Sequence, residues 1–61
     1  MSSVFVVYEE IKYSNGMDDC IVIDIYKDLF AANRRVVEAT QRAKELGDDT
    51  VTYFVIEMEL R

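Results

Sequence analysis

The residues of this chain that could do chemistry are one thiol, several closely spaced carboxylates and four tyrosines. Histidine is absent, which excludes histidine-based nucleophilic and acid–base sites. Cys20 is the sole cysteine, and no activating base is recognisable near it, so we interpret it as a small apolar strand residue. The sequence contains no glycine-rich phosphate loop and no zinc-binding spacing. We therefore expect no enzymatic activity, no catalytic residue and no cofactor.

The carboxylates offer metal binding as an alternative chemistry. Glu57 and Glu59 lie two residues apart and share one face of an expected strand. Either Glu9 or Asp24 could join them to form a carboxylate dyad or a divalent-metal site. An acidic rim that confers solubility and selects a partner explains the same residues more simply, and we expect no metal.

Tyrosine and arginine raise two further alternatives. Tyrosines on a sheet can stack nucleic-acid bases, but acidic neighbours disfavour phosphate binding, so we expect no direct contact with nucleic acid. We interpret the tyrosines as protein-interface residues: Tyr8, Tyr13, Tyr26 and Tyr53. Three arginines could clamp a small anion such as a nucleotide, although a salt-bridged helix surface also explains them: Arg34, Arg35 and Arg42.

The elements that must position these groups are strands for the most part. Runs of β-branched and aromatic residues predict strands at 4–13, 20–26 and 50–60. Asn15-Gly16, between the first two runs, predicts a hairpin. These runs are apolar at nearly every position, so both faces of the resulting sheet carry apolar residues.

One helix is predicted around 28–46, with Asp28 as its N-cap and Gly47 as its stop. Its apolar stripe has three- and four-residue spacing: Leu29, Ala32, Val36, Ala39, Ala43 and Leu46. The order β-β-α-β predicts an α+β fold in a single domain spanning 1–61. We expect a three-stranded antiparallel sheet of order 2-1-3, with a right-handed crossover and the helix packed on one face.

The strand register decides which residues share a face. A two-residue turn at Asn15-Gly16 would pair Tyr13 with Asp18 and Ile11 with Cys20. The face with the least charge is then predicted to lie under the helix: Val6, Tyr8, Ile21, Ile23, Ile25, Phe54, Ile56, Met58 and Leu60. The other face is predicted to stay uncovered: Phe5, Val7, Glu9, Ile11, Tyr13, Cys20, Val22, Asp24, Tyr26, Tyr53, Val55, Glu57 and Glu59.

A bulged or three-residue turn is the alternative, and it would slip the register. Val4, Val6 and Tyr8 would then replace Phe5, Val7 and Ile11 on the uncovered face. In either register one face remains open and apolar, because a single helix covers one face only. An apolar patch of that size exceeds what monomers usually expose, and it predicts a docking surface.

Charge and size constrain the partner. The chain has 61 residues and a net charge of −5, while the segment 27–46 holds five basic residues against three acids. The acidic sheet therefore favours a basic partner. A chain this short buries only about 60% of its unfolded surface, and its composition allows no internal disulfide, so a homodimer or a tight partner is expected to stabilise it. We expect no secretory signal, no membrane span and a cytoplasmic location.

The chain resembles short uncharacterised β-β-α-β domains of bacteria and their phages. The resemblance lies in Val6-Val7-Tyr8-Glu9-Glu10, in Ile23-Asp24-Ile25-Tyr26 before a capped helix, and in Glu57-Met58-Glu59-Leu60. In that group the second run usually has glycine where this chain has Asp24, and a serine cap where it has Asp28. In size and acidity the chain also resembles phage-encoded inhibitors of bacterial defence, including anti-CRISPR proteins. The resemblance implies no catalytic residues.

The leading hypothesis is a non-enzymatic, acidic protein-binding module that blocks a basic or nucleic-acid-binding surface of a larger host complex. Its expected apolar anchors are Phe5, Val7, Val22, Tyr26, Tyr53 and Val55. Its expected orienting acids, which would mimic phosphates, are Glu9, Asp24, Glu57 and Glu59. The alternatives are a homodimeric structural module joined through the open sheet faces, and a protein that sequesters a small anionic ligand.

Overall fold

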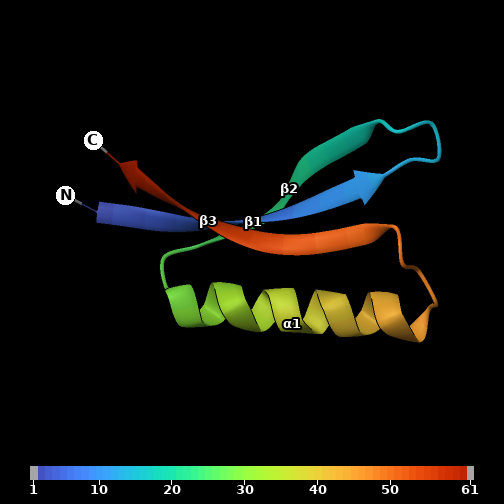
Figure 1. Ribbon diagram of the computed structural model, residues 1–61. Coiled ribbons are helices and arrows are strands. Elements are labelled where there is room, and N and C mark those ends of the chain that lie inside the picture. Colours follow the sequence, from blue (N-terminus) through green and yellow to red (C-terminus); the bar gives the residue numbers. More distant parts are fainter. Residues whose placement is uncertain (1, 61) are drawn as a thin grey trace.

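A computed structural model describes residues 2–60, which form a three-stranded sheet and one helix (Figure 1). In chain order the elements are β1 (Ser2–Lys12), β2 (Asp18–Tyr26), α1 (Leu29–Glu45) and β3 (Val51–Leu60). The strand order is β2-β1-β3, and β1 pairs antiparallel with both neighbours. The predicted α+β fold of order β-β-α-β is therefore confirmed.

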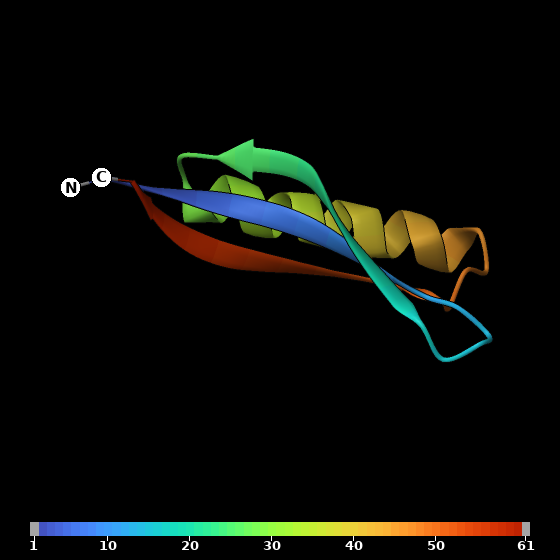
Figure 2. The same cartoon turned by 90° about the horizontal axis from the view of Figure 1, so that it is seen from above.

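The connection through α1 carries the chain from one edge of the sheet to the other. Figure 2 looks onto the sheet with α1 behind it, and β2 and β3 lie on either side of β1. Together the two views show a right-handed crossover, the sense expected for a β-α-β unit.

Both ends of α1 are set by the residues predicted to set them. The Asp28 carboxylate accepts a hydrogen bond from the Phe30 N–H (3.2 Å), which satisfies one free donor of the first turn. Gly47 ends the helix at a φ of +73°, and its N–H donates to the Lys44 carbonyl (3.1 Å).

The buried residues are two valines and three alanines: Val6, Val7, Ala32, Ala39 and Ala43. Val7 and the three alanines lie between α1 and β1, whereas Val6, the next residue of β1, points to the opposite face of the sheet. Because alanine side chains are small, a stripe of them lets a helix axis lie close to a sheet. Leu29 and Leu46, at the two ends of the predicted stripe, remain largely exposed, so the middle of the helix makes the packing contact.

The predicted two-residue hairpin turn is wrong. The Gly16 N–H donates to the Tyr13 carbonyl (3.1 Å), and the Tyr13 N–H donates to the Met17 carbonyl (2.9 Å), so the loop has three residues. A two-residue Asn-Gly turn needs a positive φ at both positions, but among residues 2–60 only glycines have one. The Asn15 side chain instead accepts from the Met17 N–H (3.0 Å), which leaves Gly16 alone in the left-handed region.

A β-bulge restores the predicted register further along the hairpin. Near the turn Ile11 pairs with Asp19, one residue away from the predicted partner Cys20. The register shifts between Val7 and Tyr8, where β2 holds one extra residue. Beyond that point Val7 pairs with Asp24, as the two-residue turn had predicted.

The predicted choice of the helix-covered face is also wrong. Arg35 of α1 forms an ion pair with Asp24, and Asp24 pairs across the sheet with Val7, so Val7 faces the helix. Val7 is 0% exposed. The same face holds most residues predicted to be uncovered: Phe5, Glu9, Ile11, Tyr26, Tyr53, Val55, Glu57 and Glu59. The hand of the crossover and the pleat of the strands select this face, whereas the prediction had relied on the number of charges.

A candidate docking surface on the uncovered sheet

The side of the sheet opposite α1 is apolar over most of its length, and Figure 2 looks onto it. Paired residues share a face, so the strand register places its side chains in rows across the sheet. We call this set the open face; its rows are Val4 and Met58, then Ile25, Val6 and Ile56, then Val22, Tyr8 and Phe54, with Leu60 at the end of β3.

The centre of the open face is packed by its own side chains. Val6 is only 3% exposed although no helix covers it, because Ile25 and Ile56 flank it in the same row. Those two isoleucines are 57% and 44% exposed. In the next row the rings of Tyr8 and Phe54 stack, with centroids 5.3 Å apart and an angle of 15° between the planes.

Charge begins only toward the hairpin. The row after Tyr8 contains Glu10, Cys20 and Thr52, and the next contains Lys12 paired with Asp18. None of the residues that make up the open face carries a charge. The open face is therefore uncharged, and the same side of the sheet becomes polar and charged toward the hairpin.

Most of the residues predicted to bind a partner lie on the helix side and do not form this surface. Of the predicted anchors and orienting acids, Val22 alone is on the open face. The alternative three-residue turn correctly placed Val4, Val6 and Tyr8 on the uncovered side. The sequence argument missed the contribution of β3 to that side, because its apolar series was assigned to the helix: Phe54, Ile56, Met58 and Leu60.

Two of the four acids predicted to orient a partner, Glu9 and Asp24, already have hydrogen-bond partners within the chain. The Tyr53 hydroxyl donates to the Glu9 carboxylate (2.7 Å), and these residues come from adjacent strands on the helix side. This hydrogen bond, followed by burial, raises the pKa of Tyr53 above its ordinary value of 10.0. Glu9 is therefore a structural partner of Tyr53.

Asp24 has two partners on the same side. The Tyr26 hydroxyl donates to its carboxylate (2.8 Å), and the Arg35 guanidinium lies 3.8 Å from it. The hydrogen bond to Asp24 is the main cause that raises the pKa of Tyr26. Glu57 and Glu59, by contrast, are exposed, near the ends of β1 and β3 that extend past the start of α1 (Figure 1).

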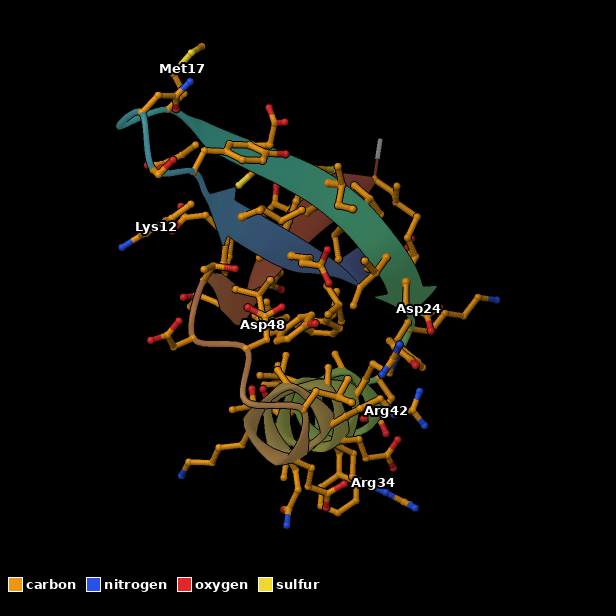
Figure 3. The ribbon with its side chains drawn as sticks, turned by 90° about the vertical axis from the view of Figure 1, so that its right-hand side faces the viewer. Lys12, Met17, Asp24, Arg34, Arg42 and Asp48 are labelled. Carbon is orange, nitrogen blue, oxygen red and sulfur yellow. The ribbon has the colours of Figure 1, made fainter. Side chains whose placement is uncertain are left out.

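The part of the chain that the structure describes forms neither a metal site nor an arginine clamp. Within residues 2–60 no group of three or more cysteine or acidic side chains is placed to hold a metal ion. Arg34 and Arg35 line a hollow of about 230 Å³ with Tyr26, but each arginine already has an acidic neighbour. Arg34 points away from the sheet (Figure 3), and Arg42 lines a different hollow. The three arginines therefore do not converge on one ligand.

Comparisons with known protein families, with curated proteins and with solved structures found no match. Over residues 2–60, no helix combines the length and the apolar character that crossing a membrane requires.

Proposed function

We propose that this chain is a non-enzymatic protein-binding module and that the open face is its docking surface. The observation that carries the proposal is a continuous, uncharged apolar surface that no element of the fold covers. Five of its aliphatic side chains are each between 44% and 57% exposed: Val22, Ile25, Ile56, Met58 and Leu60. Together they expose on the order of 400 Å², which is already near the largest patch of a typical monomer.

The chemistry of the open face favours protein over other ligands. Nucleic-acid binding needs basic residues to neutralise phosphates, and this face has none. The two hollows described above lie along α1 and not on this surface. A broad apolar surface with two aromatic rings matches the core of a protein interface.

Binding of a basic host complex, held mainly by the acidic residues of this chain, has less support. That mechanism requires apolar anchors and acids on one surface, whereas Glu9 and Asp24 are engaged on the helix side. We therefore propose that docking is apolar in character. Its affinity should change little with ionic strength, because salt screens exposed charges and leaves apolar burial intact.

The proposal is tested by the native size of the tagged chain in lysate of its own source cells. We expect gel filtration to show an apparent mass well above the 7.1 kDa of one chain, both at low salt and at high salt. Ile56→Lys should shift the chain to its monomer mass, because a lysine at the centre of the open face would be buried without a partner.

Val37→Lys is the matched control. Val37 is an aliphatic residue of α1 that is 62% exposed, and it lies outside the open face. The control should elute with the wild type. A wild-type chain that elutes as a monomer, or a complex that both substitutions leave intact, would show that the open face does not dock a protein.

A further inference from the structure

We propose that the partner docked on the open face is a second copy of this chain, packed sheet against sheet with the helices outside. The inference rests on the proposed function, since it names the partner of the same surface. The resulting dimer would have four layers, α/β/β/α, and each open face would become half of a second apolar core.

Surface area is the first argument. The chain exposes 4876 Å². A compact monomer of its mass is expected to expose about 4,100 Å². The excess is about 800 Å², which is the area that each partner buries in a protein interface of standard size. A second copy would therefore remove about as much surface as this chain has in excess.

Shape gives the same result. The radius of gyration of the Cα atoms is 12.8 Å, whereas about 10.5 Å is expected for a compact domain of this length. The Cα trace extends 41 × 24 × 10 Å, so the chain is elongated and the sheet seen face-on is long and narrow (Figure 2). A second copy packed on the open face would give that face the cover that it lacks in one chain.

The small core of one chain is the third argument. Val7 is the largest side chain that is fully buried, and most of the other buried residues are alanines. A domain of this size is marginal without an additional stabilising feature. Face-to-face packing would bury the valines, isoleucines and stacked rings of two chains in one contact, as in obligate homodimers, whose interfaces resemble a domain core.

The lack of charge on the open face permits a copy as the partner. Two chains that each carry a net charge of −5 repel one another at long range, but contact through uncharged surfaces adds little to that repulsion. The open face is uncharged and can therefore serve as both halves of a two-fold contact. A basic partner would leave its own charges without counterparts on this face.

The same reasoning sets the orientation of the two chains. The apolar rows of Val4, Val6 and Tyr8 are centred on Val6, and Glu10 follows at one end only. A two-fold axis across the strands at Val6 would stack the Val4 row on the Tyr8 row of the other copy. It would also separate the two Glu10 carboxylates, which an axis along the strands would bring together.

Sedimentation of the purified chain tests the inference separately from the proposed function. At micromolar concentration we expect twice the 7.1 kDa chain mass. Ile56→Lys should raise the dimer dissociation constant by at least about 100-fold, because each dimer then buries two unpaired charges. Val37→Lys should leave the constant unchanged. A purified wild type that remains monomeric, while its complex in lysate still depends on Ile56, would overturn the dimer and leave the docking proposal intact.

A second measurement covers the case in which Ile56→Lys does not fold. The melting temperature of a wild-type dimer must rise with protein concentration, since dimerisation is linked to folding by mass action. The melting temperature of a monomer is independent of concentration. A constant melting temperature, or a dimer that Val37→Lys dissociates and Ile56→Lys does not, would overturn the inference.

Discussion

At the scale of single residues, the helix side of the sheet shows how partly buried acids are satisfied. Glu9 and Asp24 lie beneath or beside α1, where unpaired carboxylates would be costly. Each accepts a hydrogen bond from a tyrosine hydroxyl, Tyr53 for Glu9 and Tyr26 for Asp24. Arg35 adds a distant ion pair to Asp24 at 3.8 Å, and partial exposure of both side chains keeps its contribution below about 1 kcal/mol.

The hydrogen bond from Tyr53 to Glu9 predicts a loss of stability at high pH. The pKa of Tyr53 is raised in the folded state, so the neutral phenol stabilises the fold fully below the unfolded pKa near 10. That contribution is lost as pH rises through the folded pKa. Urea denaturation between about pH 8 and about pH 11 should show this decline, and Tyr53→Phe should reduce its slope. Part of the slope should remain, because hydrogen bonds to carboxylates also raise the pKa of Tyr26 and of Tyr13. Tyr8→Phe, which removes a hydroxyl from the open face, should keep the full slope; an unchanged slope in Tyr53→Phe would contradict the assignment.

At the scale of elements, a three-residue loop and one bulge determine which residues of β1 share a face with which residues of β2. Gly16 permits the loop because its φ is +85°. The bulge near Val7 then offsets the one-residue slip, so the two halves of β2 follow different registers. Cys20 and Val22 therefore lie on the open side, whereas Asp24 and Tyr26 lie on the helix side.

Gly16 should be sensitive to substitution for a backbone reason alone. A Cβ atom at this position would meet nothing within 4 Å, so any cost comes from the left-handed conformation. We expect Gly16→Ala to lower the free energy of unfolding by about 1 kcal/mol. Gly16→Asn should cost less, because asparagine adopts this conformation more readily. Chemical denaturation of the two variants measures the difference, and equal costs would argue against the turn described above.

At the scale of the whole molecule, the sheet has two chemically different sides. One side is partly covered by α1, which contacts it through a small core, and tyrosine–carboxylate hydrogen bonds lie on the same side. The other is apolar and uncovered, and it grades into polar residues at the hairpin, whose tip at Met17 lies far from the helix (Figure 3). This asymmetry is what leads to the docking and dimer proposals.

The orientation of the dimer can be measured with a spin label on Cys20, which is the sole cysteine and is exposed. Cys20 pairs with Glu10, four residues along β1 from Val6. With the two-fold axis across the strands, the two Cys20 Cα atoms should be roughly 28 Å apart; an axis along the strands would bring them to roughly 14 Å. Pulsed dipolar spectroscopy resolves these distances, and a result near the shorter one would contradict the proposed orientation. Sedimentation of the labelled protein controls for loss of the dimer.

Much of the fold could be predicted from local patterns. The strands, the helix, its N-cap at Asp28 and its stop at Gly47 all depend on neighbouring residues, and the strand order follows from short connections and the usual crossover hand. Which face α1 covers could not be predicted in the same way, because it depends on the crossover of the whole chain. Side chains on a strand alternate with a period of two, so the slip at Asn15-Gly16 additionally moved Cys20 and Val22, in the hairpin half of β2, to the other face relative to β1.

The sequence by itself determined that one face of this sheet would be apolar and uncovered, because its strands are apolar on both faces and its helix can cover only one. Only the tertiary structure decided which face that is. The direction of the crossover and the phase of the pleat depend on the path of the whole chain. The charges that suggested the opposite choice are satisfied by Tyr26, Tyr53 and Arg35, which come from other parts of the sequence or become neighbours only through folding.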